Sequence, residues 1–97
     1  MNYTNLVRQD RRRCILQLLE QSPGYVASVP LISNVLDSEG HYVSQEVVVM
    51  ELTWLERNGM VTLESPGGVV IATLTQQGGD VACGRVMHPG VKRPDPV

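Results

Sequence analysis

Apolar residues recur at helical spacing along most of the chain, and one such stretch leads directly into an alternating, β-rich pattern. In that stretch, the residues at positions i, i+4 and i+7 are Val48, Leu52 and Leu55. Ser44 is suited to cap the start of the helix, and Gly59 to end it in a left-handed turn. The spacing predicts one helix over residues 45–58.

A short hairpin is predicted immediately after this helix. Residues 60–64 and 69–73 have strand-like patterns, and the sequence Ser65-Pro66-Gly67-Gly68 between them is a turn signal. A helix that runs directly into a two-stranded ribbon is typical of the second half of a winged helix-turn-helix.

Two further helices are predicted before this unit. The first should run from Thr4 or Asn5 to Gln21, and its buried stripe should comprise Val7, Cys14, Ile15, Leu18 and Leu19. Leu16 falls outside that stripe, so we expect it to face a partner. Residues 25–27 are expected to be extended or irregular, and are a candidate for the short first strand that winged helices often pair with the ribbon. Ser28 should cap the second helix, whose inward residues should be Leu31, Ile32, Val35 and Leu36.

A last helix is predicted after the hairpin, with Thr75 as its N-cap and with Val81 and Ala82 facing inward. Gly78 and Gly79 weaken it, by about 1 kcal/mol each relative to alanine. Such glycines indicate either close packing on a neighbour or a marginal helix.

These elements predict an α+β fold that is mostly α. We expect a winged helix-turn-helix with three helices, a two-stranded β-wing and a C-terminal helix, in a single domain over residues 1–86. The proline-containing residues 87–97 lack periodicity and are predicted to form a flexible C-terminal tail.

Three short motifs resemble a known class of regulators. Residues 12–19, Arg-Arg-Cys-Ile-Leu-Gln-Leu-Leu, are similar to the first helix of ArsR-like winged-helix proteins, and residues 52–61 are similar to their exit from recognition helix to wing. Residues 74–78 resemble the junction between wing and last helix. The whole chain resembles a small family of Mu-like phages and prophages, encoded in the late region.

This resemblance implies a protein located in the cytoplasm of the bacterial host. It would bind double-stranded DNA as a transcriptional regulator, or act as an accessory factor of late phage functions. ArsR-like proteins also pair through their first and last helices. A homodimer interface is therefore expected at Leu6, Leu16, Gly79, Ala82 and Val86. The cysteine-rich motif of the metal-sensing members has no counterpart here.

Composition narrows the classes of function. No apolar run is long enough to span a membrane or to serve as a signal sequence, which favours a cytosolic protein. Cys14 and Cys83 are far apart and are expected to be buried, reduced thiols. His41 and His88 have no nucleophile or carboxylate at motif spacing, so neither an enzyme, nor a cofactor, nor a metal site is predicted.

The charge distribution leaves two functions open. Between Cys14 and Gly84 the single basic residue is Arg57, against eight acidic residues. Candidate DNA contacts are therefore the basic ends together with two polar positions of the third helix: Arg11, Arg12, Arg13, Lys92, Arg93, Gln45 and Thr53. Alternatively, the three consecutive arginines cannot all face one ligand, and some of them are ion-pair partners of Asp10 or Glu20.

The acidic body favours the second function, a protein-protein interaction module that serves as an assembly or packaging adaptor of a phage and does not bind DNA. Glu46, Glu51 and Glu56 on the third helix, and a wing without lysine or arginine, oppose the phosphate contacts from which DNA affinity mainly comes.

Overall fold

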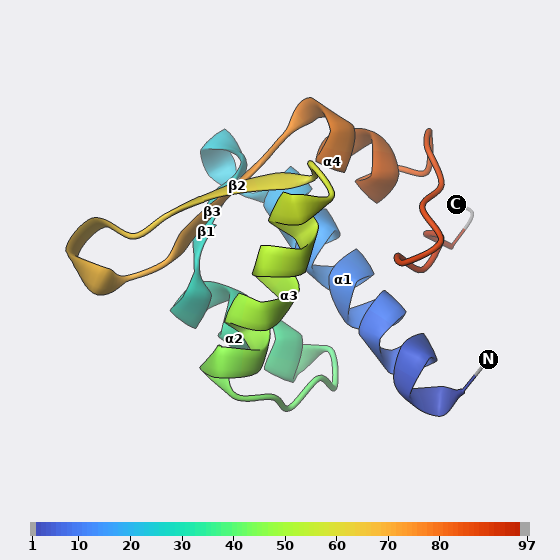
Figure 1. Cartoon of the computed structure of the whole chain (residues 1–97), viewed down its shortest axis with the longest axis horizontal. Coiled ribbons are helices and arrows are strands. Elements are labelled where there is room, and N and C mark those ends of the chain that lie inside the picture. The colour runs from blue at the N-terminus through green and yellow to red at the C-terminus, as the bar shows by residue number, and fades with distance from the viewer. Residues whose placement is uncertain (1, 96–97) are drawn as a thin grey trace.

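The computed structural model describes residues 2–95 (Figure 1). Over this range the helices are α1 (Tyr3–Gln21), α2 (Val29–Ser38), α3 (Gln45–Arg57) and α4 (Gln76–Ala82). The strands are β1 (Val26–Ser28), β2 (Val61–Glu64) and β3 (Ile71–Leu74). The fold is therefore α+β and mostly helical. No helix among the described residues is long and apolar enough to cross a membrane.

The three strands form one antiparallel sheet in the order β1-β3-β2. Val61 faces Leu74 and Glu64 faces Ile71 across the hairpin, while Ala27 of β1 faces Ala72 on the other side of β3. The predicted hairpin is thus confirmed, although β3 begins at Ile71 rather than at residue 69. In Figure 1 the loop between β2 and β3 projects away from the helices.

The ends of α3 and α4 are set by the capping residues that the sequence indicated. The Ser44 hydroxyl accepts a hydrogen bond from the Val47 amide, and Gly59 has a positive φ of 76°. At the start of α4, the Thr75 hydroxyl accepts a hydrogen bond from the Gly78 amide at 3.0 Å. Local signals therefore fix these boundaries.

The core lies where α1, α2 and α3 meet one face of the sheet. Its largest fully buried side chains are Ile15, Leu16, Leu19, Ile32, Leu36, Val48, Leu52, Leu55, Met60 and Val61. Val48, Leu52 and Leu55 were predicted for this core, as were Ile15, Leu19, Ile32 and Leu36, so the amphipathic patterns are confirmed at these positions.

Three sequence-based predictions are wrong. Leu16, expected to face a partner, is fully buried (0 % exposed), because α1 packs against α2 on one side and α4 on another, and its buried surface is wider than one stripe. Leu31 is exposed, since α2 buries only the face of Val29, Ile32 and Leu36. Cys83 is exposed beyond the last turn of α4, whereas Cys14 is buried as expected.

A carboxylate of α3 contacts the outer strand of the sheet. Glu56 Oε2 accepts a hydrogen bond from the Leu63 amide of β2 at 3.0 Å. This bond connects the end of α3 to the hairpin that follows it.

The C-terminal segment has no helix or strand from residue 83 to residue 95, yet it packs against the domain. The Lys92 amide donates to the Gln9 carbonyl of α1 at 3.0 Å, and the Val91 side chain is buried. Gly90 lies so close to Trp54 that an added Cβ would be 2.4 Å from the indole ring. Residues 96–97 of the predicted tail lie outside the described range.

The two adjacent glycines of α4 have different surroundings. A Cβ at Gly78 would lie 2.0 Å from the Met60 carbonyl oxygen, whereas a Cβ at Gly79 would meet only a Leu74 methyl group, at 3.7 Å. Of the two explanations offered for these glycines, close packing therefore applies to Gly78.

We predict opposite effects for alanine at these two positions. Gly78→Ala should lower the free energy of unfolding, because the carbonyl of Met60 must move. Gly79→Ala should leave it unchanged or raise it by up to about 1 kcal/mol, as expected for a helix interior. Urea unfolding followed by circular dichroism measures both, and equal destabilisation by the two variants would contradict the packing of α4.

Candidate functional site

A buried acid joins α3 to α1. Glu51 is only 5 % exposed, and its carboxylate accepts hydrogen bonds from Arg11 at 2.8 Å and from Arg12 at 2.9 Å. Both guanidinium groups are themselves mostly buried. The sequence analysis counted Glu51 among the acidic residues that oppose DNA binding, although its position one turn before Leu55, next to the apolar stripe of α3, could have indicated a buried ion pair. Its partners, about forty positions away, were not predicted.

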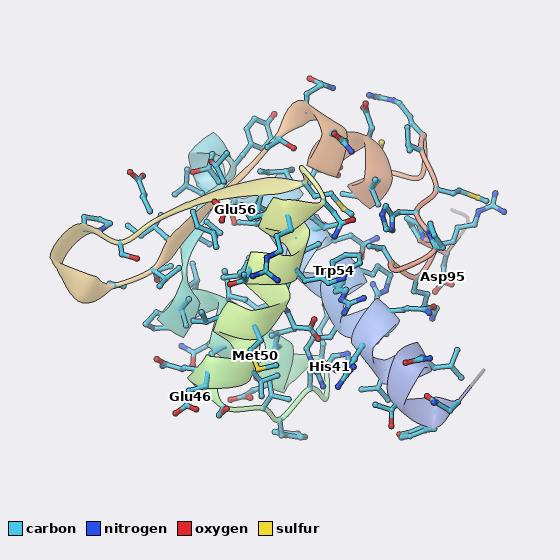
Figure 2. All side chains as sticks on the ribbon, in the orientation of Figure 1. His41, Glu46, Met50, Trp54, Glu56 and Asp95 are labelled. Atoms are coloured by element: carbon cyan, nitrogen blue, oxygen red, sulfur yellow. The ribbon has the colours of Figure 1, made fainter. Side chains whose placement is uncertain are left out.

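Arg12 connects this ion pair to the C-terminal segment. Its guanidinium lies 3.8 Å from the centre of the Trp54 ring, in cation-π geometry, and donates a hydrogen bond to the Gly90 carbonyl at 3.0 Å. His88 meets the same indole edge-on, with ring centres 5.3 Å apart. Trp54 is therefore enclosed between α1 and the C-terminal segment, and Figure 2 shows it on the α1 side of α3.

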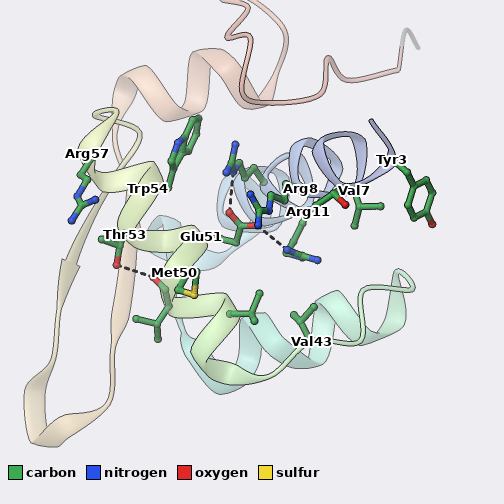
Figure 3. Close-up of a pocket in the computed structure, with 14 residues that line it drawn as sticks. Tyr3, Val7, Arg8, Arg11, Val43, Met50, Glu51, Thr53, Trp54 and Arg57 are labelled. Atoms are coloured by element: carbon green, nitrogen blue, oxygen red, sulfur yellow. Dashed lines mark hydrogen bonds and ion pairs between the residues drawn. The ribbon is translucent and has the colours of Figure 1, made fainter. Parts of the chain in front are cut away.

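A groove runs along α1 and α3 over this ion pair (Figure 3). It has a volume of about 750 Å³ and is open to solvent. Its lining comprises Tyr3, Thr4, Val7, Arg8, Arg11, Arg12, Val43, Val47, Val49, Met50, Glu51, Thr53, Trp54 and Arg57. Met50 is 66 % exposed. The α1–α3 groove thus combines apolar side chains with four arginines and a single glutamate.

Two of those arginines remain available to a ligand. Arg8 and Arg57 are exposed, and neither forms an ion pair with an acidic residue in the described part of the chain. Figure 3 shows Arg8 on α1 and Arg57 at the far end of α3. Sequence reasoning did not select these two residues, nor Met50.

The predicted DNA contacts do not form one surface. Arg11 and Arg12 are held by Glu51, while Arg13 pairs with Asp10 at 2.8 Å, which agrees with the alternative proposed for it. Gln45 is exposed at the start of α3, and the Thr53 hydroxyl donates to the carbonyl of Val49. Lys92 and Arg93 are exposed on a different hollow, beside Gln9 and Val91.

The residues predicted for a dimer interface are also separated. Leu6 and Val86 are each about half exposed and line the same hollow as Met87. Leu16 and Ala82 are buried within the chain, and Gly79 is partly covered. Leu16 and Ala82 are therefore unavailable to a partner, whereas Leu6 and Val86 keep this role as a prediction.

A second polar cluster lies on another side of α1. His41 Nε2 is 2.8 Å from Asp10 Oδ2, and the Cys14 thiol donates to Glu39 Oε2 at 2.8 Å. Burial would raise the pKa of Asp10, but hydrogen bonds from His41 and Arg13 outweigh it and lower that pKa. Burial, and then the hydrogen bond to Glu39, raise the pKa of the Cys14 thiol to about 12.

The fold and the groove define a small, mostly helical α+β protein with a ligand-sized hollow between two helices. The chain belongs to a family of Mu-like phage proteins. It is 39 % identical over 92 residues to the uncharacterized protein gp26 of Escherichia phage Mu, covering 95 % of each chain. An uncharacterized protein of Haemophilus influenzae is 36 % identical over 78 residues, with 79 % and 76 % covered. No family profile and no solved structure matches.

We predict that Glu51→Ala destabilises the protein by about 3–5 kcal/mol, since it leaves two largely buried guanidinium groups without their carboxylate. Glu46→Ala on the exposed first turn of the same helix is the matched control and should cost at most about 1 kcal/mol. Chemical unfolding gives both values. Equal effects would show that the ion pair contributes little.

Proposed function

We propose that this chain is a winged-helix protein that binds an acidic, amphipathic helical segment of another phage protein in the α1–α3 groove. The order of helices and strands supports the winged helix: α3 leads directly into the β2–β3 hairpin, and β1 adds a third strand to it. Membership of a phage family supports a phage partner. The groove itself is the observation that carries the proposal.

The chemistry of the groove specifies this partner. Its apolar side chains, among them Val7, Val47, Met50 and Trp54, suit the apolar face of a helix laid between α1 and α3. Arg8 and Arg57 would pair with carboxylates that flank this face. Because Glu51 is already held by two arginines, it does not repel such a partner.

The outer surface of α3 supports a protein partner better than a phosphate backbone. Glu46 and Met50 lie there together, as Figure 2 shows, and the loop from Glu64 to Val69 contains no basic residue. Affinity for DNA depends mainly on neutralised phosphates. A protruding methionine is instead typical of adaptable protein-binding surfaces.

A DNA-binding regulator is the second candidate, and one observation favours it. Of the three glutamates that opposed DNA binding, Glu51 is turned toward α1, and Glu56 is bonded to the backbone of β2. The outer face of α3 is therefore less acidic than the sequence suggested, and Arg57 lies at its end.

We predict that helical peptides with an acidic, amphipathic pattern, taken from proteins of the same phage, bind the chain, and that Met50→Glu abolishes this binding. Met87→Glu is the matched control, because Met87 is similarly exposed (68 %) but lies outside the groove. The double variant Arg8→Glu, Arg57→Glu should bind the peptides more weakly, and its affinity should depend less on salt concentration. Fluorescence anisotropy measures each affinity.

Titration with random duplex DNA at two salt concentrations separates the two candidates. Binding that falls steeply with salt and is lost in the Arg8→Glu, Arg57→Glu variant, together with no binding of the acidic peptides, would replace the first proposal by the second. If the Met50→Glu variant bound the peptides as tightly as the unmodified chain, this would also contradict the proposal that the groove is the binding site.

Homodimerisation is a separate proposal, supported by the exposed Leu6 and Val86 in one hollow. Leu6→Glu with Val86→Glu should convert a dimer to a monomer in sedimentation experiments, and the Tm of the unmodified chain should rise with its concentration. A monomer throughout the micromolar range would refute it. Leu31→Glu, at an exposed leucine of α2, is the control.

A further inference from the structure

The cluster beside α1 contains a set of metal-binding atoms that neither the groove nor the core explains. Asp10 and Cys14 are one turn apart on α1, and His41 follows α2 in the turn before α3. One donor atom from each of these residues lies within 4.8 Å of the other two. Glu39, two residues before His41, places a carboxylate oxygen 2.8 Å from the Cys14 sulfur.

We propose that Asp10, Cys14 and His41 bind a divalent transition-metal ion of the zinc type, with Glu39 supplying a fourth oxygen ligand. Sulfur, imidazole nitrogen and carboxylate oxygen are the ligand atoms that Zn²⁺ takes in proteins. Two ligands at i and i+4 share one face of a helix, the spacing by which helices commonly contribute to zinc sites.

Metal binding requires the cluster to rearrange, because the donor atoms of Asp10, Cys14 and His41 are spread over up to 4.8 Å, and Glu39, which contacts Cys14, lies outside that group. Bonds of about 2.0–2.3 Å to Zn²⁺ place tetrahedral donor atoms roughly 3.3–3.8 Å apart. The contact between His41 and Asp10 and that between Cys14 and Glu39, each 2.8 Å, must therefore lengthen by less than about 1 Å. When the metal binds, the Cys14 thiol releases to solvent the proton that now bonds Glu39, and the resulting thiolate binds the ion.

Besides Lys92, whose Nζ lies 3.8 Å from Asp10 Oδ1, the cation that competes for this site is Arg13. Its guanidinium lies 2.8 Å from Asp10 Oδ1 and 3.2 Å from the Cys14 sulfur, so it neutralises the cluster in the absence of a metal. The side chain is 21 % exposed and also donates a hydrogen bond to the partly buried Gln17. It can therefore swing into solvent when a doubly charged ion takes its place.

A bound metal would join α1 to the connection between α2 and α3. At present that connection is held to α1 by the contacts of Glu39 with Cys14 and Arg13 and by that of His41 with Asp10. The ion would replace them with coordinate bonds, so binding should raise thermal stability.

The test uses the untagged full chain, stripped with a chelator, and titrates it with Zn²⁺ by calorimetry and with Co²⁺ by absorbance. We expect one ion per chain and a cobalt–thiolate charge-transfer band, which should disappear when Zn²⁺ displaces the Co²⁺. Loss of a residue that only supports a metal ligand typically weakens metal binding by about 10–100-fold. Cys14→Ser and His41→Gln each remove a ligand, so each should weaken zinc binding by more than this. Cys83→Ser, which removes the exposed thiol, should leave it unchanged.

Arg13→Gln distinguishes a metal site from a purely structural ion-pair cluster. If a metal competes with the guanidinium, this variant should bind zinc about tenfold more tightly, because a nearby like charge is removed. Glu39→Gln, at a half-exposed position, tests the fourth ligand without risk to the core. Absence of uptake by both the unmodified chain and Arg13→Gln, or uptake unaffected by Cys14→Ser and His41→Gln, would overturn the proposal.

Discussion

The arrangement of helices depends on one buried carboxylate. Glu51 lies on the face of α3 that meets α1, where an unpaired charge would be strongly unfavourable, and two guanidinium groups from successive residues of α1 satisfy it. Their positions fix the separation and rotation of the two helices. Through Arg12, the same carboxylate also orients Trp54 and retains the backbone of Gly90. The floor of the groove and the course of the C-terminal segment thus both depend on the ion pairs of Glu51.

The three consecutive arginines illustrate how helix geometry divides one basic motif between different tasks. Successive side chains on a helix are about 100° apart, so they cannot serve a single ligand. Arg11 and Arg12 reach α3, whereas Arg13 turns toward Asp10 and the cluster around Cys14. The groove and the proposed metal site are consequently on different sides of α1. A partner in the groove and an ion in the cluster need not exclude each other.

The elements were predictable where local signals determine them. The apolar spacing of α3, its cap and Gly59 gave the helix and the hairpin within a residue or two, because these depend on neighbours in sequence. Leu16 was misjudged because its burial depends on α4 packing on a second side of α1. The contacts of Glu51 with α1, and of Gly90 with Trp54, join residues 36 to 40 positions apart. No local sequence pattern encodes such pairs. The two helices that form the groove could therefore be predicted, but the groove itself could not.

The bond between Glu56 and the Leu63 amide bears on how copies of this protein behave when crowded. With β3 in the middle of the sheet, β2 is an outer strand, and the unpaired backbone groups of such a strand can recruit a strand from another molecule. The carboxylate of Glu56 occupies one of these donors and places a negative charge beside it. Strand-to-strand aggregation along β2 is thereby hindered, and the protein can reach higher concentrations before its copies associate through this edge.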